Sequence, residues 1–150
     1  MQIFAKKFIF LEYFIIEEGK FWDSILEVLK RKAKESVEVK VLYDDIGCMG
    51  TLPGNYFRLL KKYNIDCIPF SKLKGQADGE FNNRSHRKIL VIDGKVGFTG
   101  GVNIADEYIN HRIVYGHWKD TGIKLKGEAV NELTKLFLTS SSNFLLLITV

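Results

Sequence analysis

The stretch from His86 to Gly94 constrains the fold more than any other part of the sequence, because it joins two polar residues to a solid aliphatic run and an Asp-Gly pair. Side chains alternate across a β-strand, so His86 and Lys88 share one face. Asp93 and Gly94 between aliphatic runs indicate a two-residue hairpin loop, with residues 95–99 as the returning strand. The sequence therefore predicts an antiparallel hairpin that carries a polar site at its open end.

The register of this predicted hairpin brings glycines close to the histidine. With a two-residue loop, Lys88 stands opposite Thr99 and His86 stands opposite Gly101. Gly100 and Gly101 have no side chains, so they leave space for a tetrahedral group against the backbone. We expect these two glycines to line a binding space for a phosphate-sized group.

Asn103 follows the glycines and adds an amide donor to the same place. A short helix expected over residues 104–109 would also offer its N-terminal amides to an anion. A nucleophile, a fixed cation and an amide donor thus surround one phosphate-sized space. This combination favours one half of a phosphoryl-transfer site.

The rest of the chain alternates strands and helices. Aromatic and β-branched runs predict strands at 8–16, 37–43 and 66–70, and apolar residues at helical spacing predict helices at 21–34, at 55–63 and from about 128 onward. Residues 71–83 lack periodicity and indicate a surface loop. The order predicts an α/β fold that opens with a βαβ unit and a parallel strand pair.

Composition limits the domain count and the kinds of partner. A chain of 150 residues with 46% hydrophobic residues suits one domain, which we assign to residues 1–140, followed by an apolar tail at 141–150. The net charge of +4 mildly favours phosphate-bearing partners such as anionic lipid or nucleic acid. No apolar run reaches the roughly 18–20 residues that span a bilayer. Cys48 and Cys67 stand in unrelated contexts, so neither a disulfide framework nor a metal cluster is indicated.

The central motif resembles that of a known family. His86, Lys88 and Asp93 match the H-x-K-x-x-x-x-D pattern of the phospholipase D superfamily, and residues 100–103 match its downstream G-[SG]-x-N segment. Within the superfamily, the amino-acid sequence is most similar to that of the first catalytic domain of bacterial cardiolipin synthases, over roughly residues 4 to 140. The resemblance implies a three-layer α/β half, in which a mixed β-sheet carries helices on both faces and the site lies at strand ends.

The resemblance also implies a chemistry that uses no metal and no cofactor. His86 would attack a phosphodiester to form a phosphohistidine, while Lys88 and Asn103 hold the phosphoryl oxygens. Asp93 completes the motif but looks structural, because it lies in the turn and on the opposite parity from His86. An acidic residue on a later strand binds the other ring nitrogen of the histidine in this family. Asp120 lies in the matching segment and either takes that role or is an ordinary strand-end carboxylate.

One motif supplies only half of the usual active site. Gly101 stands where many members have serine, and His111 and His117 lack the strand and glycine segment of a second motif. We expect the other half to be a missing C-terminal domain or a homodimer mate. The apolar end of the tail, residues 144–150, favours a truncated continuation over a natural homodimer.

The function implied by the resemblance is cardiolipin synthesis by a phosphatidyltransferase, with phosphatidylglycerol or another anionic phospholipid as substrate and a bacterial cell membrane as the site of the parent enzyme. Two alternatives stay open. One is a homodimeric phospholipase D-like nuclease or phosphodiesterase, and the other is a non-catalytic truncated remnant. Acidic residues interspersed among the basic ones argue against nucleic acid.

Several charged residues outside the motif have two interpretations. Glu12 interrupts an apolar strand and is assigned to a solvent-facing strand edge in preference to a buried, site-supporting position. Asp44 and Asp45 follow a strand, where they would meet a ligand or cap the loop, and metal binding is not expected. Arg84 flanks the histidine and would neutralise lipid phosphate, whereas Arg87 is assigned to solvent.

Overall fold

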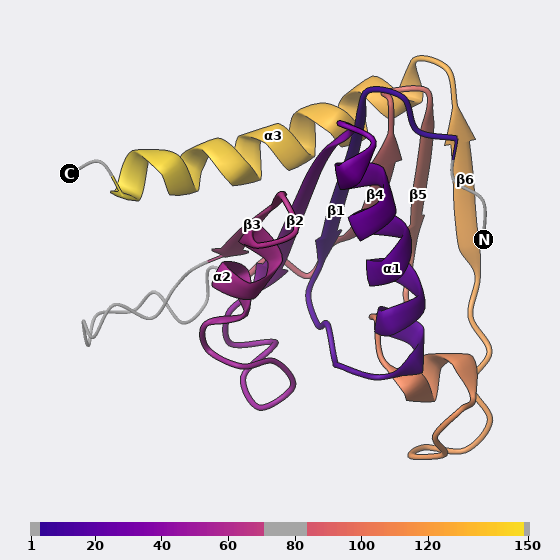
Figure 1. Ribbon diagram of the computed structural model, residues 1–150. Coiled ribbons are helices and arrows are strands. Elements are labelled where there is room, and N and C mark those ends of the chain that lie inside the picture. The colour runs from indigo at the N-terminus through magenta and orange to yellow at the C-terminus, as the bar shows by residue number, and fades with distance from the viewer. Residues whose placement is uncertain (1–3, 71–83, 149–150) are drawn as a thin grey trace.

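Six β-strands form the middle layer of the computed structural model (Figure 1). The structure describes residues 4–70 and 84–148, so the loop predicted at 71–83 lies outside the described residues. Neighbouring strands follow the order β3-β2-β1-β4-β5-β6, in which β1–β2 and β2–β3 are parallel and the other three pairs are antiparallel. The strands are β1 Phe8–Tyr13, β2 Glu38–Asp44, β3 Ile65–Phe70, β4 Lys88–Ile92, β5 Val96–Gly100 and β6 Gly122–Lys126.

Helices cover both faces of this sheet, as the sequence predicts. The helices are α1 Lys20–Lys34, α2 Tyr56–Lys61, the 3-10 helix η2 Asp106–Ile109, and α3 Ala129–Ile148. One apolar cluster joins α1 and α2 to alternate residues of β1, including Ile9 and Leu11. A second cluster joins α3 to the residues of β1 that point to the opposite face, such as Phe10. The rings of Phe10 and Phe137 stack there with centroids 4.7 Å apart. Figure 1 shows α1 and α3 on opposite sides of the strands.

The first strand ends three residues earlier than its apolar run suggests. Residues 8–16 were expected to form one strand, but β1 ends at Tyr13. The next residues pair with another segment, because Ile104 N–H donates to the Ile15 carbonyl at 3.1 Å and Glu17 N–H donates to the Ile104 carbonyl at 2.8 Å. This pairing brings the chain that follows Gly101 back beside the end of β1.

The hairpin between β4 and β5 forms, but with a different register. Lys95 N–H donates to the Ile92 carbonyl at 3.0 Å, which closes the expected turn, yet Ile92 is paired with Val96. Lys95 is therefore an extra residue on the returning strand. Thr99 consequently pairs with Ile89, so the prediction that it stands opposite Lys88 is wrong. The same shift removes Gly101 from the position opposite His86.

The last helix continues past residue 140, where the domain was expected to end. We assigned residues 141–150 to a tail outside the domain, but α3 runs without interruption to Ile148. Its hydroxyl side chains bond back along the helix: Thr139 donates to the Lys135 carbonyl and Ser140 to the Leu136 carbonyl. Across the described ranges, no helix is both long and apolar enough to cross a bilayer.

Candidate active site

His86 and Lys88 meet at the start of β4, on the face of the sheet that carries α1. The Lys88 ammonium lies 3.0 Å from Nδ1 and 3.1 Å from Nε2 of His86, and it donates to the His86 carbonyl at 2.9 Å. His86 is exposed, whereas Lys88 is only 4% exposed. Burial lowers the pKa of Lys88 because it disfavours the charged form. The sequence prediction that these two side chains share a face is correct.

The ring of Phe14 packs against both His86 and Lys88. Its ring centroid lies 4.7 Å from that of His86, and the Lys88 Nζ lies 5.5 Å from the same centroid. An ammonium over an aromatic ring is held by the ring's quadrupole. Phe14 thus restricts both the imidazole and the cation, a role for which its position just after β1 gave no signal.

Asn103 is tied to the same part of the chain. It is buried, its Oδ1 accepts the Ile15 N–H at 3.2 Å, and its Nδ2 donates to the Tyr108 hydroxyl at 3.2 Å. Tyr108 in turn packs edge-on against Trp118, with centroids 4.8 Å apart. Because Ile15 directly follows Phe14, this bonding places the amide next to the residue on which His86 rests.

Asp93 lies at the other end of β4 and holds the N-terminal segment. Its carboxylate accepts the backbone N–H groups of Lys6 and Lys7 at 2.8 Å each and of Phe8 at 2.9 Å. Burial alone would raise the pKa of this carboxyl, but the three donors together hold it below its ordinary value. Asp93 is seven positions after His86, about 23 Å along an extended strand. Its contacts agree with the structural role inferred from its parity.

Gly100 and Gly101 lie close to the chain that leads into β6. A Cβ on Gly101 would lie 2.5 Å from the Oδ2 of Asp120, and one on Gly100 would lie 3.3 Å from the Thr121 carbonyl oxygen. Both glycines therefore allow the chain that leads into β6 to approach closely. Lining of a phosphate space by these glycines stays a prediction.

Asp120 lies at the surface beside Gly101. It is exposed, and its Oδ1 accepts the Thr121 N–H at 2.6 Å. Among the hydrogen bonds of the described residues, none joins Asp120 to His86. Support of the histidine by Asp120 stays a prediction.

The segment after Asn103 does not form the anion-binding helix that was expected. η2 is a four-residue 3-10 helix with Asp106 and Glu107 in its first turn, and acidic groups there repel an anion. The Asp106 carboxylate instead accepts the N–H groups of Phe21 at 2.8 Å and Lys20 at 3.2 Å. These bonds cap the first turn of α1, and the bond from Phe21 is the main cause of the lowered pKa of Asp106.

A buried polar network lies behind His86, on the α3 side of the sheet. Glu12 is 0% exposed and accepts hydrogen bonds from the Ser85 hydroxyl at 2.5 Å and the Arg87 Nε at 2.9 Å. Arg87 also donates to Ser140 of α3. The assignment of Glu12 to a solvent-facing edge is wrong, because β1 is an inner strand between β2 and β4. Arg87, which was assigned to solvent, keeps 37% of its side chain exposed while it pairs with Glu12. A charged residue inside an apolar strand was the signal for this network.

Asp44 forms a second buried carboxylate nearby. It is 1% exposed, its Oδ1 accepts the Gly47 N–H at 2.8 Å, and the same oxygen lies 3.4 Å from Arg84. Asp44 thus caps the loop after β2, one of the two alternatives that the sequence left open. Asp45 contributes its backbone N–H to the Phe70 carbonyl at 3.1 Å. Within the described chain, no group of three His, Cys, Asp or Glu side chains is arranged to hold a metal ion.

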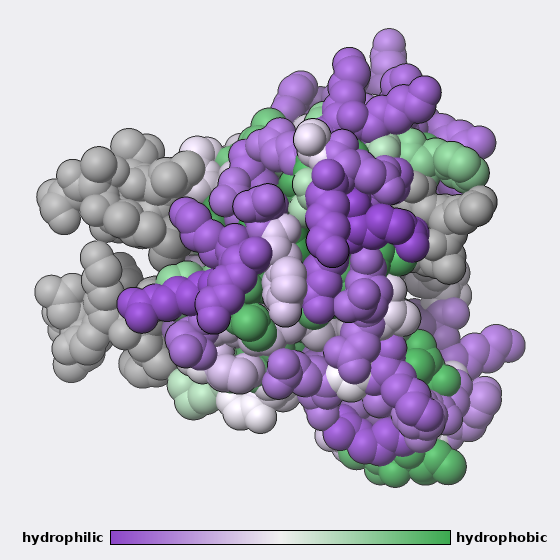
Figure 2. Space-filling view, in the orientation of Figure 1, coloured by the Kyte–Doolittle hydropathy of each residue, from purple (hydrophilic) through white to green (hydrophobic). Residues whose placement is uncertain are grey.

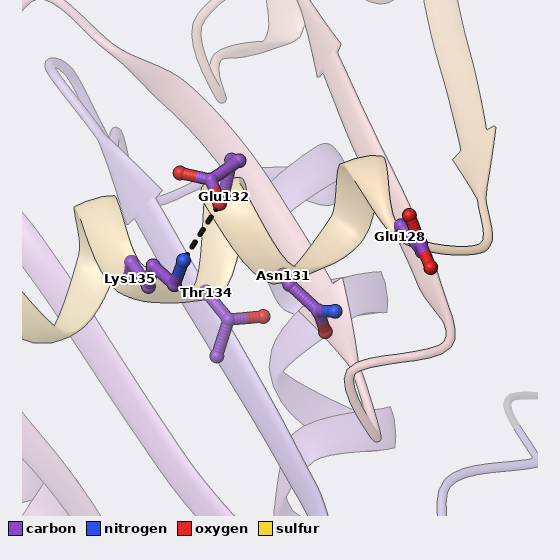
Figure 3. A pocket seen from close by; sticks show the side chains of 5 residues that line it. All are labelled: Glu128, Asn131, Glu132, Thr134 and Lys135. Atoms are coloured by element: carbon purple, nitrogen blue, oxygen red, sulfur yellow. Dashed lines mark hydrogen bonds and ion pairs between the residues drawn. The ribbon is translucent and has the colours of Figure 1, made fainter.

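Two surface hollows lie away from His86. One of about 420 Å³ lies along α3, where Figure 3 shows the Glu132–Lys135 ion pair of 2.7 Å among its five lining residues. The other, of about 250 Å³, lies over the loop after β2 and is lined in part by Asp45 and Met49. Neither is lined by a residue of the motif.

Comparison with known proteins agrees with the geometry. A family model described as "Cardiolipin synthase, PLD-like domain" matches residues 5–139. A cardiolipin synthase of Halalkalibacterium halodurans is 42% identical over 135 residues, which cover 89% of this chain and 27% of that protein. An uncharacterized protein of Streptococcus mutans is 50% identical over 134 residues, covering 89% of this chain and 29% of that protein. The chain therefore spans less than a third of the length of these relatives.

The structural comparison supports the fold. Nuc from Salmonella typhimurium, a phospholipase D family member, superposes with a TM-score of 0.63 at 14% identity, covering 93% of this chain and 80% of that one. This likeness confirms the predicted α/β architecture with its mixed sheet. The family model matches nearly the whole chain. The chain belongs to the cardiolipin synthase group of phospholipase D-like domains.

Proposed function

We propose that this chain supplies the first half of an active site that transfers a phosphatidyl group through a phosphohistidine. The observation that carries the proposal is the exposed imidazole of His86 held within 3.1 Å of the buried Lys88 ammonium. An exposed ring can reach a substrate, and a buried cation close to it attracts the phosphate that the ring attacks. The substrate is phosphatidylglycerol, and the product is cardiolipin.

The reaction has two balanced steps. A ring nitrogen of His86 attacks the phosphorus of one phosphatidylglycerol, the bond from phosphorus to the glycerol oxygen breaks, and the leaving glycerol takes a proton from a general acid. The headgroup hydroxyl of a second phosphatidylglycerol then attacks the phosphorus, gives up its proton to that same group, and frees His86. Lys88 and Asn103 hold the phosphoryl oxygens during both steps.

Turnover at an enzymatic rate needs a general acid from a second half; without it, water protonates the leaving glycerol and the first step is slow, so the chain alone is labelled once and does not turn over. Attacking and leaving groups lie roughly in line across the phosphorus, so one imidazole does not serve both. The related cardiolipin synthase is much longer than the matched segment, which covers 27% of it. We infer that a further domain of a longer parent protein carries the second motif, in preference to the mate in a homodimer.

A bacterial membrane surface is the proposed place of action. The loop between η2 and β6 exposes Ile113 (79%), Val114 (47%) and Tyr115 (80%). Figure 2 shows apolar surface at the end of the molecule where Figure 1 draws this loop, while the face over α1 is mainly hydrophilic. Exposed apolar side chains beside a phospholipid-cleaving site suit contact with a bilayer interface.

A homodimeric phosphodiesterase is the second candidate, because the chain covers 80% of Nuc, a phospholipase D family member of similar size. Incubation with labelled phosphatidylglycerol and, separately, with labelled single-stranded DNA distinguishes the two. We expect alkali-stable, acid-labile labelling from the lipid, absent in His86→Asn and kept in His117→Asn, which changes a histidine outside the motif. Labelling from DNA alone supports the phosphodiesterase. Labelling from neither substrate, or label that survives in His86→Asn, contradicts both candidates.

A further inference from the structure

We propose that Glu12 and Asp44 act together as a buried carboxylate clamp that fixes segment 84–88 and thereby orients His86. Glu12 and Asp44 are positioning residues in this proposal, since neither touches the substrate. The proposal rests on the proposed function only in taking His86 as the nucleophile. The clamp concerns only how His86 is held in place.

The clamp engages the residues on both sides of the histidine. Ser85 and Arg87 donate to Glu12 at 2.5 and 2.9 Å, and Arg84 lies 3.4 Å from the Asp44 carboxylate. Ser85 and Arg87 have the opposite parity to His86, so they face the α3 side while the imidazole faces the α1 side. The residues before and after His86 are therefore fixed from behind, and the imidazole stays exposed.

Two strands of the sheet provide the anchor. Glu12 lies on β1 and pairs with Ile89 of β4, and Asp44 ends β2, which pairs with β1. These strands lie in the middle of the sheet and carry the apolar cores on both faces. Segment 84–88 is thus bonded to buried inner strands, and such an anchor suits a nucleophile that needs a fixed direction of attack.

Burial energetics also point to a role beyond stability. Glu12 is 0% exposed, and its Oε2 has no hydrogen-bond partner within the described part of the chain. Glu12 is taken wholly out of water, whereas the Arg87 side chain is 37% exposed. Burying a carboxylate is costly unless all its bonds are made, and apolar replacements of buried ion pairs are often as stable. An ion pair at this position is therefore better explained by the orientation it imposes than by the stability it adds.

The last helix extends the clamp. Arg87 donates to the Ser140 hydroxyl, and that hydroxyl donates to the Leu136 carbonyl at 3.0 Å. Ser141, the next residue, is equally buried, but its hydrogen bond among the described residues stays within its own helix, to the Leu138 carbonyl at 2.9 Å. The helix therefore offers a pair of neighbouring hydroxyls of which one contacts the clamp, and Ser141→Ala is a matched control for Ser140→Ala.

The test measures the order of segment 84–88 without activity. Amide hydrogen exchange is followed in the unchanged chain, Glu12→Gln, Ser140→Ala and Ser141→Ala. Glu12→Gln keeps the size of the side chain and removes its charge. We expect exchange in 84–88 to rise about tenfold or more in Glu12→Gln, because hydrogen bonds to a charged group are lost, while β5 changes little. A smaller rise in the same segment is expected in Ser140→Ala and none in Ser141→Ala.

Unchanged exchange at 84–88 in Glu12→Gln, or an equal rise throughout the sheet, overturns the clamp. Should Glu12→Gln fail to fold, Ser140→Ala decides, and exchange equal to that of Ser141→Ala overturns it. Lipid labelling of His86 in the unchanged chain is measured in parallel. Absence of that labelling together with the expected exchange pattern refutes the proposed function and leaves the clamp intact.

Discussion

Replacement of Asp93 tests whether the motif aspartate is structural or chemical. Asp93→Ala removes the acceptor for three backbone N–H groups and puts alanine where the backbone φ is 55°. Asp93→Asn keeps one acceptor oxygen and a residue type that tolerates this left-handed conformation. We expect Asp93→Ala to be clearly destabilised, Asp93→Asn to be mildly destabilised, and His86 labelling to persist in both.

The magnitude follows from two contributions. A left-handed backbone costs an alanine about 1–2 kcal/mol. The lost hydrogen bonds add about 1 kcal/mol in total, because the bonds from Lys6 and Lys7 are exposed and water replaces them. A loss of about 2–3 kcal/mol corresponds to a fall in Tm of roughly 5–10 °C for a chain of this size.

The stabilisation that the Asp93 carboxylate contributes falls as the pH is lowered. The pKa of Asp93 is lowered in the folded chain, so its contribution is present above the ordinary carboxyl pKa of about 3.9. That contribution is lost as the pH falls through the lower pKa of the folded state. Asp93→Asn has no such group, so the difference in stability between it and the unchanged chain should shrink in acid.

Urea unfolding and thermal scans at pH 7 and in the acid range below about pH 4 measure these differences. Asp66→Asn, at an exposed position of β3, is the matched control and should differ little from the unchanged chain. The reasoning is refuted if Asp93→Ala unfolds at the same temperature as this control. It is also refuted if a folded Asp93→Asn protein loses His86 labelling, which would place the carboxylate in the chemistry.

Three further outcomes are expected. Phe137→Ala should lower the free energy of unfolding by about 3–5 kcal/mol, because the ring is fully buried against Phe10; a loss under about 1 kcal/mol in urea titration would contradict that packing. Lys88→Ala should weaken inorganic phosphate binding about tenfold or more by NMR titration, whereas Lys95→Ala should not; equal affinities would remove Lys88 from the phosphate site. A strictly monomeric chain should show no turnover of phosphatidylglycerol, and an enzymatic rate from a monomer in sedimentation-coupled assays would disprove the half-site.

Short-range sequence patterns were sufficient to predict most of the elements and the proximity of His86 and Lys88. Apolar spacing located α1, and the aliphatic run after His86 located β4, because both depend on which face of one element is buried. The proximity of His86 and Lys88 followed from strand parity alone, since two residues at i and i+2 of a strand share a face. Local geometry was sufficient in each case.

Features that depend on how segments pair and pack became visible in the tertiary structure. The extra residue Lys95 changed the register of the hairpin, although the turn signal itself was correct. Glu12 became buried because β4, more than seventy residues later, pairs with β1, and Ser85 is 73 residues away from the carboxylate it bonds. Position 101 has no room for a side chain because Asp120 lies against it. The burial of Glu12 and the close approach at Gly101 depend on residues outside their own segments. The hairpin register depends instead on the one residue that the turn leaves unpaired, which the turn signal does not specify.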